Sequence, residues 1–171
     1  MDIEQFQQKF LPLKNKMYRY AYTFLADDDE AMDAVQDAFL KIWDKKRKWS
    51  DIRNYEAWSM QIIRNLCLDR IKSGNFKKIV RGTEIDDHLA AVYPAYEEEE
   101  MARLVEKLID KLPSKQREAM ALRDQEGYNY QEISEIMSIE MSQVKICIYR
   151  ARKYIRKELI RITTYGTAKD Q

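Results

Sequence analysis

Cations gather on one predicted helix near the carboxyl end of the chain. Apolar side chains recur about every four residues, near the helical period, at Val144, Ile148, Ala151, Ile155 and Leu159. Lysine and arginine occupy many of the positions between them: Lys145, Arg150, Arg152, Lys153, Arg156, Lys157 and Arg161. A helix that buries the apolar stripe presents these charges to solvent. A face of one sign can bind a polyanion, and the phosphate backbone of DNA is the leading candidate.

A shorter helix is expected immediately before the basic one. Asn129 can cap it, and Glu132 can return the hydrogen bond, which is the pattern of a capping box. Tyr128 and Ile133 are spaced to form a hydrophobic staple around the cap, and a break follows at residues 138–140. A short helix, a tight turn and a basic helix are the parts of a helix-turn-helix, whose second helix enters the DNA major groove. The alternative is an ordinary helical hairpin with a solvated basic face.

The composition favours an all-α protein. With 171 residues, 45% of them hydrophobic, the chain can bury a core as one domain or as two small ones. Glycine and proline are few, at 4 and 3, and no alternation of β-branched residues indicates strands. The apolar runs are short, so no membrane insertion is expected, and residues 1–5 lack the pattern of a secretion signal.

Residues suited to catalysis or metal binding are sparse. His88 is the one histidine and has no cysteine nearby, so we expect neither a zinc site nor acid–base catalysis. Cys67 and Cys147 fall within helical patterns, where cysteine is usually a small core residue, and this usage suits a reducing cytoplasm. Without a nucleophile–base pair or a phosphate loop, we expect no enzyme, no cofactor and no small-molecule substrate.

Apolar periodicity and capping residues divide the chain into helices. In the first half they are predicted at residues 3–26 with a break at Pro12, at about 28–46 after a cap at Asp27, and at 54–73 after a cap at Asn54, with a loop at 47–53. In the second half they are predicted at 97–112, from Pro113 to about 126, and in the helix-turn-helix, with a frayed tail from residue 163.

The net charge of +1 conceals a separation of charge along the chain. The middle of the chain is basic, residues 84–100 are acidic, and the last helix is basic again. Periodicity lapses from about residue 75 to 96, where Pro94 and the acidic residues indicate a linker. The predicted architecture is therefore two small all-α domains joined by an acidic linker, with two contacts to a polyanion.

Five stretches of sequence resemble the motifs of one family. Residues 33–43 (DAVQDAFLKIW) resemble D-x-V-Q-[ED]-x-F-L-x-[LI]-W, and residues 57–70 (AWSMQIIRNLCLDR) resemble its tryptophan-initiated helix, although the basic residue here is Arg70, next to Asp69. Residues 112–118 (LPSKQRE), 130–137 (YQEISEIM) and 144–152 (VKICIYRAR) resemble L-P-x-x-x-R-E, Y-x-E-I-A-x-x-L and V-K-x-x-x-x-R-A-R. In this order the motifs resemble an extracytoplasmic-function sigma factor of bacterial RNA polymerase.

The resemblance implies a two-domain initiation factor. Sigma region 2 would span residues 1–75, dock on the β′ clamp helices of core RNA polymerase and open the −10 promoter element. Region 4 would span residues 97–163 and bind the −35 element and the β flap, after a linker at 76–96 and before a tail at 164–171. The resemblance also implies an anti-sigma factor as partner and a cytoplasmic location.

The resemblance assigns polymerase docking to the helix at 28–46. The docking residues would be Asp33, Gln36, Asp37, Leu40, Trp43 and Asp44. Helix packing competes for Leu40 and Trp43, but both lie beside the core stripe of Phe39 and Ile42 rather than on it. An exposed tryptophan is a typical interface anchor.

The −10 element is assigned to the basic loop and the helix after it. Promoter opening requires unpaired bases to be captured by aromatic faces and a cationic groove. Tyr55 and the loop at 48–54 are the preferred candidates, whereas the spacing of Trp58 favours core packing. The predicted −10 residues are Lys48, Arg53, Asn54, Tyr55, Arg64, Asn65 and Asp69. For Arg64, Asn65 and Asp69 the alternative is a solvated helix face.

The −35 element is assigned to the basic helix, whose first turns would face base edges. Gln143 can pair with adenine, and Lys145 with guanine or a phosphate. The predicted −35 residues are Ser142, Gln143, Lys145, Tyr149, Arg150, Arg152 and Lys153, of which the last three suit phosphates. The turn holds Ser-Ile-Glu where the family has Gly-Ile-Ser, and Gln143, Ile146 and Cys147 also depart from the family pattern, which bears on the −35 preference.

Two other functions remain open. A small dimeric helix-turn-helix regulator would bind duplex DNA without polymerase. A helical adaptor would bind no nucleic acid. Affinity for core polymerase would distinguish a sigma factor from both of these alternatives.

Overall fold

The computed structural model describes residues 2–73 and 98–167, and every regular element in these two segments is helical. The first segment contains α1 (Asp2–Lys9), a 3-10 turn (Leu11–Leu13), α2 (Lys14–Leu25), α3 (Asp28–Asp44), a 3-10 helix (Lys46–Asp51) and α4 (Tyr55–Lys72). The second contains α5 (Glu98–Asp110), α6 (Ser114–Met120), a π-helical turn (Ala121–Gln125), α7 (Tyr130–Met137) and α8 (Met141–Thr167). The all-α prediction is confirmed. The predicted linker at 76–96 lies outside the described residues.

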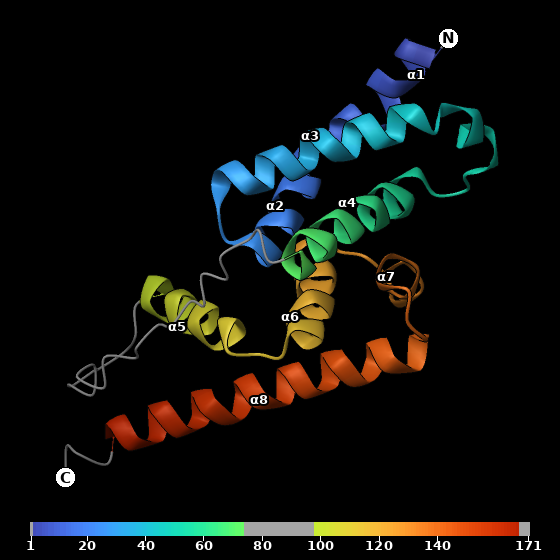
Figure 1. Ribbon diagram of the computed structural model, residues 1–171. Coiled ribbons are helices and arrows are strands. Elements are labelled where there is room, and N and C mark those ends of the chain that lie inside the picture. The colour runs from blue at the N-terminus through green and yellow to red at the C-terminus, as the bar shows by residue number, and fades with distance from the viewer. Residues whose placement is uncertain (1, 74–97, 168–171) are drawn as a thin grey trace.

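Helices α2, α3 and α4 pack against one another as a bundle (Figure 1). Their apolar stripes meet at side chains that are almost completely buried, including Met17, Ala34, Ile42 and Ile63. Burial of these side chains stabilises helices that would be marginal in isolation.

A cluster of aromatic side chains supports the segment between α3 and α4. Trp49 is 2% exposed, and its indole N–H donates to the carbonyl oxygen of Ile42 at 3.1 Å. The Phe10 ring centroid lies 4.8 Å from that of Trp49, and the Tyr55 hydroxyl donates to the Trp49 carbonyl at 3.0 Å. Trp58 packs against the same cluster, as its spacing predicted. The predicted loop at 47–53 is therefore mostly a 3-10 helix (Lys46–Asp51) anchored by a buried tryptophan.

In the second segment, α6, α7 and α8 pack together, and α5 covers the middle of α8. The predicted apolar stripe of α8 is confirmed, since Val144, Ile148, Ala151 and Ile155 are all buried. The helix continues to Thr167, so the frayed tail predicted from residue 163 begins too early.

All three predicted helix caps are confirmed. The side chains of Asp27 and Asn54 each accept a hydrogen bond at 2.9 Å from a backbone N–H in the first turn of α3 and α4. Asn129 and Glu132 form the reciprocal bonds of a capping box, both at 2.9 Å. Each cap satisfies backbone donors that would otherwise lack a partner at the helix start.

The two described segments pack into one body. Figure 1 shows α6 running between α4 and α8, and α4 also packs against α7. Buried side chains of both segments, such as Tyr20 and Ile63 from the first and Leu122 and Ile136 from the second, belong to one continuous apolar cluster. The helix-turn-helix therefore lies directly against the amino-terminal bundle.

Candidate nucleic-acid and protein interfaces

The helix-turn-helix is held by local and tertiary contacts. Ile133 and Ile136 of α7 bury against Val144 and Ile148 of α8 within the same apolar cluster. Ser138 ends α7 in the left-handed conformation, with φ 53°, at the C-cap position where glycine is favoured. The turn thus keeps helix-turn-helix geometry despite its unusual residues.

The seven predicted −35 residues are all exposed on α8: Ser142, Gln143, Lys145, Tyr149, Arg150, Arg152 and Lys153. Arg152 pairs with Asp124 at 2.7 Å, and the Lys153 ammonium lies 5.9 Å from the Tyr149 ring centroid. A hollow of about 340 Å³ lies between Tyr130 and the cations Lys145, Arg152, Lys153 and Arg156. This face combines positive charge with aromatic surface, which suits contact with a phosphate backbone.

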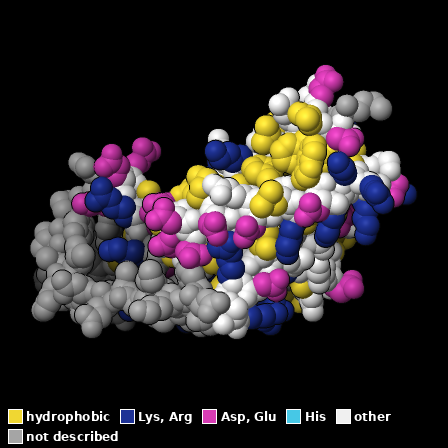
Figure 2. Space-filling model, turned by 45° about the horizontal axis from the view of Figure 1, so that its top comes forward, with side chains coloured by type: hydrophobic (Ala, Val, Ile, Leu, Met, Phe, Trp, Pro, Cys, Tyr) yellow, Lys and Arg dark blue, Asp and Glu magenta, His cyan; other side chains and the backbone are white. Residues whose placement is uncertain are grey.

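A second candidate surface lies on α3. Leu40 is 64% exposed, and Trp43 is half-buried at its side. Asp33, Gln36 and Asp44 are exposed on the same helix, and Asp37 is partly so. Figure 2 shows apolar side chains gathered beside acidic ones on this side of the molecule. Exposed apolar groups rimmed by charge are typical of a protein–protein interface.

The acidic residues of α3 are held by one arginine from α4. The Arg70 guanidinium lies 2.8 Å from Glu30, 2.7 Å from Asp33 and 2.6 Å from Asp37. Partial burial alone would lower the pKa of Arg70, but these carboxylates outweigh it and raise that pKa. Arg70 therefore fixes the positions of Asp33 and Asp37, two of the predicted docking residues.

The predicted −10 residues fall into two groups. Lys48, Arg53, Asn65 and Asp69 are exposed. Asn54, Tyr55 and Arg64 are partly buried, because Tyr55 packs in the aromatic cluster and the other two contact the second half of the chain. The Asn54 amide donates to Glu132 at 3.3 Å, across a groove lined by Lys48, Arg53 and Trp58 on one side and Asn129 and Glu135 on the other.

Arg64 belongs to a buried polar triad that joins the two halves. Its Nε lies 2.5 Å from Glu118, and the Tyr20 hydroxyl donates to the same carboxylate at 2.5 Å. Glu118 is 4% exposed. Burial, together with the nearby negative charge of Glu118, raises the pKa of Tyr20, which stays a neutral donor. Burial alone would lower the pKa of Arg64, but the hydrogen bonds and negative charge of Glu118 outweigh this effect. The pKa of Arg64 is therefore raised, and the guanidinium stays charged.

Sequence reasoning did not identify Tyr20 and Glu118 as partners of Arg64. Glu118 lies 54 positions from Arg64 and 98 from Tyr20, so no local spacing links them. The one available signal was an acidic residue on the inward side of α6, beside the buried Ala119.

Comparison with known proteins gives the family. The sigma-70 region 2 family matches residues 10–76, and the sigma-70 region 4 family matches residues 102–155. The ECF RNA polymerase sigma factor SigW of Bacillus subtilis is 31% identical over 157 residues, which cover 85% of this chain and 84% of SigW. The chain belongs to the ECF sigma factors. One further relative supports this. SigM of Bacillus subtilis is 26% identical over 162 residues, covering 91% of this chain and 94% of SigM.

A solved structure of the sigma factor RpoE from Bartonella quintana, bound to the anti-sigma factor NepR, matches with a TM-score of 0.69 and 25% identity. The match covers 91% of this chain and 97% of RpoE. Because both sigma regions match in order, the stand-alone helix-turn-helix regulator is not favoured. This sigma factor directs promoter-specific transcription by RNA polymerase. No helix among the residues described here has the length and apolar character needed to cross a membrane.

Proposed function

We propose that this sigma factor docks on core RNA polymerase through α3 and reads its promoter through two separate surfaces. The first half acts as region 2, residues 1–75, and the second as region 4, residues 97–163, with residues 76–96 as the connector. The chain acts in the cytoplasm by binding alone, without catalysing a reaction of its own. An anti-sigma factor controls it, as the NepR complex of the related RpoE suggests.

The exposed apolar and acidic face of α3 supports the docking assignment. The Leu40 side chain is 64% exposed, so it contributes little to the stability of the free protein and is available to a partner. The rim of Asp33, Asp37 and Asp44 would meet cations on the β′ clamp helices and set the register. Gln36 and Trp43 complete the surface.

Region 2 captures the opened −10 strand with the exposed residues Lys48, Arg53, Asn65 and Asp69. Asn54, Tyr55 and Arg64 join them when region 4 moves away. Region 4 reads the −35 element through the amino-terminal end of α8. Gln143 and Lys145 approach base edges there, and Ile146, 46% exposed, offers an apolar contact to a thymine methyl group.

A docking assay with purified core polymerase tests the proposal. Leu40→Asp places a charge at the centre of the surface and is expected to weaken core binding at least tenfold, since loss of a central anchor costs about 2 kcal/mol or more. The matched control is Ile160→Asp, which alters another exposed apolar residue, 58% exposed, at the far end of α8. Both variants are expected to melt near the wild-type temperature. Equal core affinity of Leu40→Asp and the control would remove α3 from the docking surface.

A further inference from the structure

The first turns of α8 present apolar side chains to solvent. We infer that region 4 reads the −35 element by its C5-methyl groups: Ile146, with Tyr149 beside it, contacts the methyl group of a thymine in the major groove and requires a methyl-bearing pyrimidine at that position. Thymine is the unmodified DNA base that carries this group, and 5-methylcytosine carries the same group. This inference rests on the proposed assignment of α8 to the −35 element.

Ile146 lies on the side of α8 that faces away from the protein. Val144 and Ile148 are almost completely buried, and Ile146 is two residues from each, which is a little over half a helical turn. Its side chain is 46% exposed. Tyr149, 65% exposed, is three residues further on and therefore lies on the same side. Both side chains thus meet a DNA duplex that approaches the exposed face of the helix.

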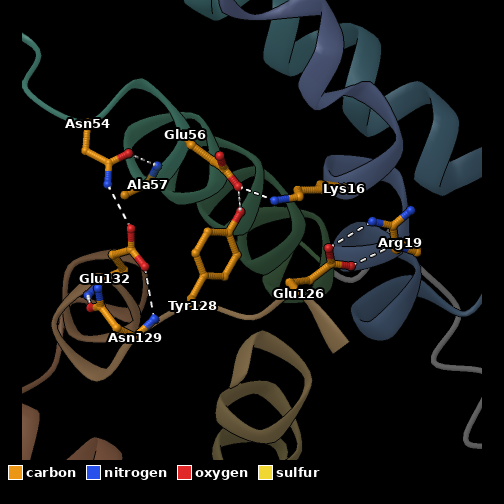
Figure 3. A network of polar contacts seen from close by, with 9 residues as sticks. All are labelled: Lys16, Arg19, Asn54, Glu56, Ala57, Glu126, Tyr128, Asn129 and Glu132. Atoms are coloured by element: carbon orange, nitrogen blue, oxygen red, sulfur yellow. Dashed lines mark hydrogen bonds and ion pairs between the residues drawn. The ribbon is translucent and has the colours of Figure 1, made fainter. Parts of the chain in front are cut away.

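The turn that leads into α8 is held in place from both ends of α7. Figure 3 shows the capping box at the start of α7, in which Asn129 and Glu132 exchange hydrogen bonds at 2.9 Å. Near the end of α7, the Ser134 hydroxyl donates to the carbonyl oxygen of Ile139 at 2.6 Å. A fixed backbone gives Ile146 one position against the groove, as the discrimination of a single methyl group requires.

Charge is distributed unevenly along the exposed side of α8. Residues 140–149 contain one glutamate and one lysine, so this stretch is neutral. Residues 150–157 contain five cations and no acid. The cations suit phosphates, which fix the register of a protein on DNA without reading sequence. The neutral stretch is the part that approaches base edges, where an apolar side chain needs an apolar group of the DNA as its partner.

The C5-methyl group of thymine is that apolar group in the major groove. The Ile146 side chain has no polar atom, so it cannot bond to the acceptors and amino groups that other base edges present. Against cytosine it would remove water from the amino group without replacing the hydrogen bond, which costs free energy. Ser142, one turn earlier on the same side, is short, so a base edge can approach Ile146 closely.

Tyr149 extends the apolar surface by one turn. It follows Ile146 by about 4.5 Å along the helix axis, at about 1.5 Å per residue. Base pairs in duplex DNA are about 3.4 Å apart, so the two side chains can meet methyl groups of adjacent bases. The Lys153 ammonium lies 5.9 Å from the Tyr149 ring centroid, within the range of a cation–π contact. The expected element therefore has a thymine opposite Ile146 and favours a second methyl group beside it.

The test uses the holoenzyme formed from core RNA polymerase and the full chain. The holoenzyme first selects duplexes from a random-sequence library, and sequencing identifies the −35 element of the selected duplexes. We expect a fixed thymine in that element. Each fixed thymine is then replaced in otherwise identical duplexes, so that T·A, U·A, C·G and 5-methylcytosine·G pairs are compared by competition binding.

The contribution of the methyl group is measured twice, as the affinity ratio of T·A to U·A and as that of 5-methylcytosine·G to C·G. We expect the wild type to bind the methyl-bearing duplex about fourfold more tightly in both comparisons, which is the effect of burying one methyl-sized group. Ile146→Ser should reduce both ratios to near one. Each ratio is internal to one variant, so a general weakening of DNA binding does not change it.

The matched control is Ile160→Ser, which changes another exposed isoleucine of α8, 58% exposed. Ile160 lies roughly 21 Å further along the helix than Ile146, at about 1.5 Å per residue. The control should keep both ratios at their wild-type values. Both variants change exposed side chains and are expected to fold, which circular dichroism checks.

Three results would overturn the inference: selected −35 elements without a fixed thymine, a wild-type ratio near one in either comparison, or ratios that persist in Ile146→Ser. The first two would show that the methyl group is not read, and the third that another side chain reads it. In each case the proposed function stands, because the holoenzyme has still selected promoter elements. A chain that does not bind core, or whose holoenzyme selects no duplex, would show that the proposed function itself is wrong.

Discussion

Removal of Arg70 is expected to destabilise region 2 and to weaken polymerase docking together. The arginine, with a side chain 20% exposed, bonds to Glu30, Asp33 and Asp37, whose side chains are 47%, 62% and 45% exposed. Such partly solvated pairs contribute about 0.2–1 kcal/mol each, so the three together contribute roughly 1–2 kcal/mol. Without the arginine, the three carboxylates lie one turn apart on α3 as like charges, which adds repulsion.

For a chain of this size, a loss of about 1 kcal/mol lowers the melting temperature by about 2–4 °C, so Arg70→Gln is expected to melt about 2–8 °C lower. Arg70→Lys keeps the charge but lacks the planar fork that engages several carboxylates, so an intermediate loss is expected. Core affinity should fall in the same order, because Asp33 and Asp37 lose their fixed positions.

Differential scanning calorimetry gives the melting temperature, and titration of labelled core polymerase gives the affinity. Arg161→Gln is the control, since it removes one exposed pair with Glu158 and should cost less than about 0.5 kcal/mol. The reasoning is refuted if Arg70→Gln melts no lower than the control. A stable Arg70→Gln that binds core as tightly as wild type would show that the carboxylates need no positioning.

Three other predictions concern region 4 and the cysteines. Asn129→Ala removes the capping box and should cost about 1 kcal/mol in urea denaturation, with faster amide exchange in the first turn of α7; unchanged exchange there would argue against the cap. Arg150→Ala should weaken promoter binding, leave base preference unchanged and reduce the salt slope by about one charge; altered preference with the same slope would refute the phosphate assignment. In native protein at pH 8, Cys67 should resist thiol reagents because burial raises its pKa to about 12, whereas the half-buried Cys147 should react; rapid loss of both thiols would contradict this packing.

The parts of the fold that depend on residues close together in the sequence could be predicted from the sequence. The caps at Asp27, Asn54 and Asn129 are local hydrogen bonds, and residue type and spacing specify them. The buried stripe of α8 follows from a helical period that persists over several turns. The exposure of Leu40 followed from its place beside the stripe of α3 rather than on it.

Contacts between distant residues could not be predicted. Arg64 lies on a polar helix face and was open to interpretation as surface or as a DNA contact, but its partner Glu118 belongs to another region. The 3-10 helix at Lys46–Asp51 depends on Trp49, which packs against Phe10 from the beginning of the chain. The extension of α8 to Thr167 has no capping signal in the sequence. In each case tertiary packing decides the structure, and a local pattern does not report it.

Reconstitution of core RNA polymerase with this chain is the most direct test of the central claim, that two cationic helical regions act on DNA as a subunit of the polymerase. The mixture is run on fragmented genomic DNA, and the 5′ ends of the transcripts are mapped. The account predicts a stoichiometric complex and a discrete set of start sites, absent with core alone, that share elements near −10 and −35. A chain that fails to bind core and adds no start sites, yet binds duplex DNA tightly by itself, would contradict it.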